Sequence, residues 1–158
     1  MKENNIRITA CNHSLPEHKQ AIINLIDAYI KDEMGEGIPL SENEQEALVE
    51  GLRTHPRAIV RFAESDGNFI GIVVAYEHFS TFTAKPMINI HDVFVLKAYR
   101  GRGVGRKLME AIIHDAEIRG CSRISLEVRQ DNIKAQKLYR SVGFDETEPP
   151  MYYWRKYL

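Results

Sequence analysis

The chain has 158 residues and a mass of 18.2 kDa, enough for one core that buries about two thirds of the unfolded surface without disulfides or a structural metal. Hydrophobic residues make up 44% and charged residues 27%, a globular composition that excludes disorder. Lys and Arg number 21 against 22 Asp and Glu, so no overall positive charge attracts nucleic acid or anionic lipid. We expect a single domain over residues 1–158, with neither a nucleic-acid partner nor a membrane partner.

The sequence predicts neither an export signal nor a cysteine framework. No apolar run approaches the roughly 18 residues that cross a bilayer, and residues 1–10 lack the apolar core of a signal peptide. We therefore expect a cytoplasmic protein. Cys11 and Cys121 are the only two cysteines and lie far apart with no pairing motif, so we expect buried small apolar side chains and no metal site.

The first half of the chain predicts a strand, two helices and a β-hairpin. The second helix has the clearest start, because Ser41 followed by Glu44 is the reciprocal capping pattern. The turn over residues 65–68 carries the Asp-Gly pair that joins antiparallel strands. In chain order we expect a strand at 6–10, a helix from Pro16 that ends by Gly35 and Gly37, a helix from Ser41 to Thr54, and strands at 58–63 and 69–79.

The second half changes to an alternation of strands and helices. This order implies a parallel pair of strands joined by a right-handed helical crossover, and therefore a mixed α/β fold. The first of these helices has one apolar stripe and one charged face, so it packs on a sheet. Gly143 stands where a left-handed cap ends the last helix. We expect strands at 88–96, 123–128 and 151–157, and helices at 104–119 and 132–142.

A glycine-rich basic loop lies between the end of a strand and the start of a helix. Residues 100–107 run Arg-Gly-Arg-Gly-Val-Gly-Arg-Lys. The three glycines let the backbone approach a ligand closely, and the first N–H groups of the following helix present the positive end of its dipole. The loop therefore predicts a ligand that carries phosphate.

Two common phosphate motifs do not fit this loop. A P-loop needs Gly-Lys followed by Ser or Thr, but Lys107 is followed by Leu108. A dinucleotide fingerprint lacks its last glycine whichever glycine starts the count, although Glu127 stands where a ribose-binding acid would be expected. A nicotinamide or nucleotide enzyme is thus the weaker alternative, and it predicts protection by NAD or ATP but not by coenzyme A.

The loop and its surroundings resemble the GNAT superfamily of acyl-CoA N-acyltransferases. The family signature is Gln or Arg, two residues, Gly, one residue, then Gly or Ala, which here is Arg100, Gly103 and Gly105. The similarity continues to Asn132 and to a Tyr-x-x-x-Gly-Phe segment that begins at Tyr139. The resemblance implies the GNAT fold, a mostly antiparallel twisted sheet with a splayed parallel central pair, flanked by helices.

The resemblance also implies an acetyl-CoA-dependent N-acetyltransferase. Acetyl-CoA would be the acyl donor, with no metal, and the acetyl group would pass directly to a primary amine of a small cationic acceptor, such as a polyamine or an aminoglycoside, or to a peptide amine. The donor would be held by backbone groups around Phe94, Val95 and Leu96, by the loop and helix start at Arg100, Gly101, Arg102, Gly103, Val104, Gly105, Arg106 and Lys107, and by Asn132.

Acetyl transfer to an amine needs a base, because an alkyl amine with a pKa of about 10.4 is almost fully protonated at pH 7. Family members often carry a glutamate on the strand before the loop, where this chain has His91 followed by Asp92. An imidazole is better matched to neutral pH than a carboxylate, which favours His91. Strand alternation predicts that only one of the two faces the cleft. Glu77, His78 and solvent remain open as alternatives.

Tyr139 resembles the general acid of the family, whose phenol returns a proton to the departing sulfur. Asn132 and Tyr139 are seven residues apart, about 10 Å along a helix axis, so they share one face of the last helix. A core aromatic is the alternative for Tyr139, since it shares its stripe with apolar residues.

Seven acids lie within residues 32–50, in the two-helix region that forms a wall of the acceptor cleft in the family. This charge is compatible with a cationic acceptor, but a solvated acidic helix face is the favoured interpretation. The competing functional class is a non-catalytic acyl-CoA-binding sensor or structural module with the same pocket. The sequence leaves open the acceptor, the acyl chain length and the oligomeric state, including a homodimer.

Overall fold

The computed structural model describes residues 5–35 and 37–158. The chain divides into two compact units, one up to Leu126 and one over Glu127–Leu158. The single domain over the whole chain stays a prediction. Among the helices of the residues described, none has both the length and the apolar character needed to cross a bilayer.

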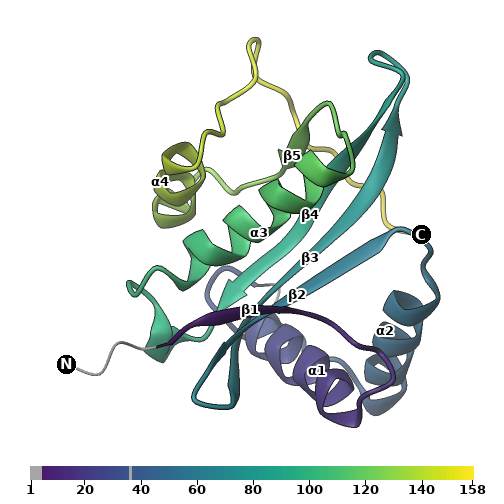
Figure 1. Cartoon of the computed structure of the whole chain (residues 1–158), viewed down its shortest axis with the longest axis vertical. Coiled ribbons are helices and arrows are strands. Elements are labelled where there is room, and N and C mark those ends of the chain that lie inside the picture. Colours follow the sequence, from purple (N-terminus) through teal and green to yellow (C-terminus); the bar gives the residue numbers. More distant parts are fainter. Residues whose placement is uncertain (1–4, 36) are drawn as a thin grey trace. The chain divides into compact units, whose positions relative to one another are not determined.

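The first unit is built on a five-stranded sheet (Figure 1). The first four strands pair in antiparallel fashion with their neighbours, and β5 pairs with β4 in parallel. The predicted mixed α/β class, with a mostly antiparallel sheet and one parallel pair, is confirmed. In sheet order the strands are β1 (Arg7–Ala10), β2 (Ala58–Ser65), β3 (Asn68–Ser80), β4 (Lys85–Val95) and β5 (Ile124–Leu126).

Helices cover both faces of this sheet, with α3 on the face opposite to α1 and α2 (Figure 1). The capping box that Ser41 and Glu44 predicted is present at the start of α2. The helices of the first unit are α1 (Pro16–Ile30), α2 (Glu42–Thr54), the short 3-10 helix η1 (Lys97–Tyr99) and α3 (Val104–Ile118).

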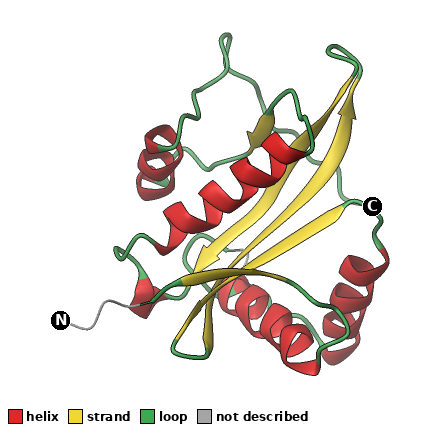
Figure 2. Ribbon diagram, viewed as in Figure 1, coloured by secondary structure: helices red, strands yellow, loops and turns green. Residues whose placement is uncertain are grey.

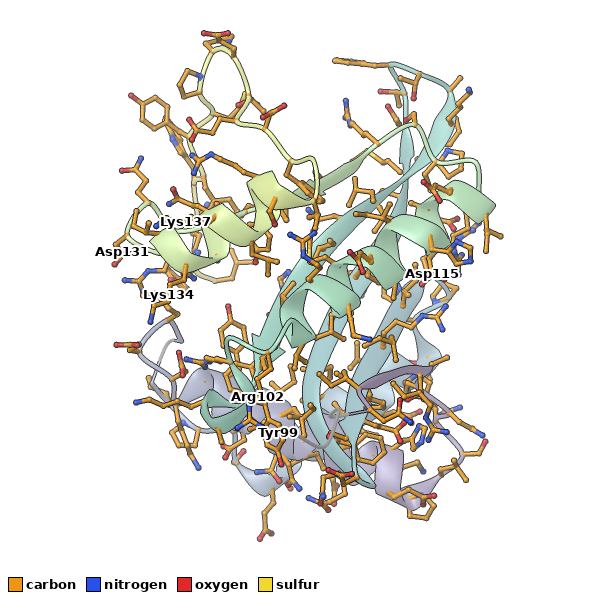
Figure 3. The ribbon with its side chains drawn as sticks, turned by 60° about the vertical axis from the view of Figure 1, so that its left-hand side comes forward. Tyr99, Arg102, Asp115, Asp131, Lys134 and Lys137 are labelled. Carbon is orange, nitrogen blue, oxygen red and sulfur yellow. The ribbon has the colours of Figure 1, made fainter. Side chains whose placement is uncertain are left out.

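Successive side chains of β2 point alternately to the two faces of the sheet, one covered by α1 and α2 and the other by α3. Phe62 is fully buried in the core that α1 and α2 form with β3 and β4. Arg61, its neighbour, points to the opposite face. There its guanidinium donates two hydrogen bonds to Asp115 of α3, one of them 2.9 Å from Nε to Oδ2. Asp115 is only 7% exposed (labelled in Figure 3), and the sequence patterns did not point to this buried ion pair.

The second unit contains one helix, α4 (Ile133–Ser141), and otherwise loop (Figure 2). The predicted strand at 151–157 is wrong, because these residues form no strand. Their aromatic side chains suit a sheet, but a strand needs a hydrogen-bonded neighbour to be stable. Tyr152 and Trp154 are instead 90% and 85% exposed.

Candidate active site

The two parallel strands separate part of the way along β4. Only Ile88, Asn89 and Ile90 pair with β5, whereas β4 remains paired with β3 as far as Val95. Beyond Ile90, no strand in the described part of the chain pairs with the other edge of β4. This edge therefore presents backbone groups that an extended amide-containing ligand can bind.

At the open edge of β4, the backbone groups of Val95 point outward. The N–H of Leu96 donates to the carbonyl of Ile70 on the β3 side, at 2.9 Å. Since backbone groups alternate in direction along an antiparallel strand, those of Val95 face away from β3. Phe94, Val95 and Leu96 were predicted to hold the acyl donor, and of these Val95 has the outward backbone. Phe94 buries its side chain against Tyr29, with ring centroids 5.4 Å apart.

Arg100, the first residue of the loop signature, is engaged by the protein itself. Its Nε donates to the carbonyl of Val95 at 2.9 Å, and its terminal nitrogen pairs with Asp32 at 2.8 Å. Its guanidinium also lies over the ring of Phe94, 5.4 Å from the centroid. Burial would raise the pKa of Asp32, but the hydrogen bonds from Arg100 and from the amide of Met34 hold it below its ordinary value. Arg100 therefore fixes the loop to β4 and to the segment after α1.

The glycine loop has the backbone geometry that its composition predicted. Gly101 and Gly103 have φ angles of 75° and 78°, in the left-handed region that favours glycine. Gly103 is the residue before α3 and makes no side-chain capping bond, so the first N–H groups of the helix are not capped by it. A Cβ at Gly103 would meet no atom of the structure within 4 Å. The helix start is thus open to an anion.

The remaining basic side chains of the loop have partners within the chain. The guanidinium of Arg102 lies over the Tyr99 ring, 5.3 Å from the centroid, and Figure 3 shows the two residues side by side. Lys107 donates to the carbonyl of Ile6 at 3.4 Å, and Arg106 lies 3.7 Å from Glu110. Val104 is buried, so only its backbone can serve a ligand. The geometry favours backbone amides over side chains as the main anion contacts.

A β-bulge places His91 and Asp92 on the same side of β4. Asp92 pairs with Val74 and Ile90 pairs with Ala75, so His91 has no partner on β3. The ring of His91 contacts Tyr76, with centroids 5.9 Å apart, and Tyr76 lies two residues from Val74 on the same face. The prediction that only one of the two side chains can face the cleft is wrong, because the extra residue interrupts the alternation.

Tyr76 connects these residues to the end of α2. The ring of His55, which follows α2, lies 4.8 Å from the ring of Tyr76. Burial raises the pKa of the Asp92 carboxyl, and the charge of His91 opposes this rise. Burial and the negative charge of Asp92 together raise the pKa of Tyr76. We call His55, Tyr76, His91 and Asp92 the bulge cluster.

Replacing Asp92 by Asn should raise the free energy of unfolding at pH 7. Because the pKa of Asp92 is higher in the native state than in the unfolded chain, stability falls as pH rises between those two values. Above this range the wild type carries the full cost of a partly buried charge, which Asn lacks. Urea unfolding should therefore show a larger difference between variant and wild type at pH 7 than at pH 4. Asp66→Asn, at an exposed turn, is the control, and a pH-independent difference would contradict the interpretation.

Glu77, one of the alternative bases, is engaged in ion pairs. One of its carboxylate oxygens accepts from Arg57 and the other accepts from Arg119 at 2.7 Å. Its side chain is only 11% exposed. Both carboxylate oxygens of Glu77 are thus already engaged by arginines, which leaves neither oxygen free for an incoming amine. His78, the next residue, is exposed.

In the second unit, the ends of α4 explain most of the Tyr-x-x-x-Gly-Phe segment. The N–H of Phe144 donates to the carbonyl of Tyr139, and that of Gly143 donates to the carbonyl of Arg140. Gly143 has a φ of 95°, and the rings of Tyr139 and Phe144 are in contact at 6.2 Å. These are the bonds and the apolar contact of a Schellman motif, so Gly143 and Phe144 serve the helix end and orient the tyrosine.

Asn132, which was predicted to contact the acyl donor, lies at the other end of α4 and caps this helix. Its side-chain oxygen accepts a hydrogen bond from the N–H of Ala135 at 3.1 Å. Capping fixes the orientation of the amide, whose NH₂ group is a donor that the cap does not use.

Three acids of the segment at 32–50 form ion pairs or caps within the protein. Asp32 pairs with Arg100, Glu44 caps α2, and Glu50 accepts from Arg53 at 2.7 Å. Glu36 lies outside the described residues. The number of acids in the segment is therefore a weaker argument for a cationic acceptor than the sequence suggested.

The two cysteines are half-buried rather than fully buried. Burial raises the pKa of Cys11 to about 11 and also raises that of Cys121. Both thiols therefore stay protonated at neutral pH, which makes them poor nucleophiles.

Comparison with known proteins agrees with this geometry. The profile of the Acetyltransferase (GNAT) family matches residues 23–144. The uncharacterized N-acetyltransferase YhfO of Bacillus subtilis is 30% identical over 101 residues, which span 64% of this chain and 68% of that protein. An aminoglycoside N(6')-acetyltransferase type 1 of Salmonella typhimurium is 27% identical over 97 residues, spanning 60% of this chain and 67% of that protein.

Solved structures show the same fold. The structure of AAC(6')-Iy in complex with the bisubstrate analog CoA-S-monomethyl-acetylneamine has a TM-score of 0.78 at 21% identity, and the match covers 96% of this chain and 99% of that one. Because the family profile spans most of the sequence, and includes both β4 and the glycine loop, the chain belongs to the Acetyltransferase (GNAT) family.

Proposed function

We propose that this protein transfers an acetyl group from acetyl-CoA directly to a primary amine of a small cationic acceptor. The observation that carries the proposal is the open edge of β4 beside a left-handed glycine loop that starts α3. A strand edge binds amides, and an uncapped helix start binds phosphate, and these match the pantetheine amides and the pyrophosphate of coenzyme A. The similarity to an aminoglycoside acetyltransferase supports an amine-rich acceptor.

The proposed donor contacts follow from the backbone. Val95 offers its outward N–H to the pantetheine, next to Phe94 and Leu96. The amides of residues 101–107 hold the pyrophosphate, and Arg100 acts by keeping the loop in place. Asn132 is the proposed contact from α4. The donor is a substrate here, and the proposed chemistry needs no metal.

In the proposed reaction the amine nitrogen attacks the thioester carbon, and the carbon–sulfur bond then breaks. His91 accepts the proton that the amine loses, and the hydroxyl of Tyr139 supplies a proton to the departing thiolate. His91 is exposed at the bulge, so it is accessible to an amine, whereas the carboxyl of Asp92 is partly buried. A general base and a general acid each contribute about 10²- to 10⁴-fold to such reactions.

Acetyl-CoA binding and acetyl transfer test the proposal separately. Calorimetry should detect binding of acetyl-CoA, and released thiol should report turnover with a panel of polyamines, aminoglycosides and peptide amines. Binding without thiol release across the panel would favour the non-catalytic module. Thermal protection by NAD or ATP without protection by coenzyme A would overturn the proposal.

Removing the proposed base should change the pH dependence of the reaction. His91→Ala should lower kcat by about 10²-fold near neutral pH and remove the limb of the pH–rate profile that depends on the base. His114→Ala, an exposed histidine on α3, should leave the profile unchanged. An unaltered profile for His91→Ala would point to Asp92 or to solvent as the proton acceptor.

A methyl group on Gly103 should weaken donor binding more than it weakens the fold. Gly103 and Gly67 have φ angles of 78° and 76°, and a Cβ on either would meet no atom of the structure within 4 Å. Alanine at each should therefore cost a similar 1–2 kcal/mol or so of backbone strain. Calorimetry should show at least tenfold weaker acetyl-CoA binding for Gly103→Ala and little change for Gly67→Ala, which lies in the β2–β3 turn. Equal affinities would contradict the proposed phosphate site.

A further inference from the structure

The bulge cluster contains an acid that no Lys or Arg side chain pairs with in the described residues. The other partly buried acids of the first unit have such partners: Asp27 pairs with Lys31, Asp32 with Arg100, Glu64 with Arg7, Glu77 with Arg57 and Arg119, and Asp115 with Arg61. Asp92 has only the neighbouring His91 as a source of positive charge. A partly buried carboxylate without a cationic partner is unfavourable unless a ligand supplies the charge.

The aromatic rings around Asp92 suit a cationic ligand. Tyr76 lies between two imidazoles, with interplanar angles of 63° to His55 and 66° to His91. Because Val74 is opposite Asp92 and lies two residues from Tyr76, the tyrosine and the carboxyl share one face of the sheet. An aromatic ring next to a carboxylate is a favourable site for an ammonium group.

His55 is held in a fixed orientation at the rim of the cluster. Its Nδ1 accepts a hydrogen bond from the N–H of Arg57 at 3.1 Å, so in the neutral ring the proton is on Nε2. Both His55 and His91 are exposed, whereas Tyr76 is half-buried against the core of α1 and α2. The cluster is therefore a solvent-facing site and not a part of the sealed core.

We propose that Asp92 and Tyr76, with His55 at the rim, bind a second ammonium group of the acceptor, so that the enzyme prefers diamines over monoamines. This inference rests on the proposed function, because it takes the amine next to His91 as the reacting one. The reacting amine must lose its proton, whereas the ammonium at Asp92 keeps its charge. The preferred acceptors thus carry two amino groups separated by a short linker, the chemistry shared by polyamines and amino sugars.

Two small probes of equal length test this preference. 1,4-Diaminobutane carries two charges, and 4-amino-1-butanol replaces one ammonium with a hydroxyl. Proton NMR can follow the ring signals of the six histidines, with His55 and His91 assigned from His→Gln variants. In the wild type the diamine should shift the signals of His55 and His91 at a concentration at least tenfold lower than the amino alcohol does.

The variants assign the preference to individual side chains. Asp92→Asn should reduce the tenfold preference to less than about threefold, whereas Asp66→Asn, at an exposed turn, should preserve it. Tyr76→Leu should weaken binding of the diamine at least tenfold, and Tyr76→Phe, which keeps the ring, should restore most of it. Thermal unfolding and acetyl-CoA affinity check that each variant is folded.

Three results would overturn the inference. The two probes could shift the histidine signals at the same concentration, the diamine could shift the signals of His78 or His114 as much as those of His55 and His91, or it could leave His55 and His91 unshifted. Each of these is independent of acetyl-CoA binding, which calorimetry measures separately. Acetyl-CoA binding without a response of the histidines would therefore leave the proposed function standing and reject only the diamine site.

Discussion

Replacing Tyr139 by Phe should lower kcat by about 10²-fold and leave the affinity for acetyl-CoA within about twofold of the wild type. The substitution keeps the ring, so the contact with Phe144 and the Schellman motif at the end of α4 should survive. Only the hydroxyl that would protonate the thiolate is lost. The expected signature is a reduced kcat with an unchanged dissociation constant for the donor.

Steady-state kinetics with an acceptor from the amine panel, together with calorimetry, would measure the two effects. Tyr157→Phe removes a hydroxyl from an exposed ring in the same unit and is the matched control. If donors with better leaving thiols restore the rate of Tyr139→Phe, the loss lies in thiolate protonation. An unchanged turnover number would mean that Tyr139 is not the general acid. It would then be a packing residue on the apolar face of α4, the alternative that its helical spacing suggests.

Features that depend on a few adjacent residues could be predicted from the sequence. The capping box of α2 needs only Ser41 and Glu44, and the end of α4 needs Gly143 in the left-handed region. The glycine loop belongs to the same class, because its φ angles and its place before α3 follow from its composition. Such signals are local, so no knowledge of the rest of the chain is required.

Features that depend on the exact register between two strands, or on contacts between side chains of different elements, could not be predicted. The bulge at His91 arises from the register between β3 and β4, and a regular alternation gave the wrong orientation for the two candidate bases. The ion pair between Arg100 and Asp32 likewise joins two residues that are 68 positions apart in the sequence. Residues 151–157 show the converse case, since a strand-like pattern forms no strand without a partner.

The buried ion pair between Arg61 and Asp115 should contribute more to stability than the exposed pair between Arg106 and Glu110 does. Asp115→Asn removes the charge that compensates Arg61 on the α3 face of the sheet. Breaking a fully buried pair costs about 3–5 kcal/mol, but the Arg61 side chain is 27% exposed and water can partly solvate it. We therefore expect a loss of about 2–4 kcal/mol in the free energy of unfolding, which for a chain of this size lowers Tm by about 5–12 °C.

Urea unfolding of three variants would test this expectation. Glu110→Gln breaks the exposed pair with Arg106 on the outer side of the same helix and should change stability by less than about 0.5 kcal/mol. Arg61→Met combined with Asp115→Leu should recover most of the loss, because the cost lies in the unpaired buried charge more than in the missing attraction. If the double variant is as unstable as Asp115→Asn, the two hydrogen bonds themselves hold α3 on the sheet. A change below 1 kcal/mol or so in Asp115→Asn would show that solvent already compensates Arg61.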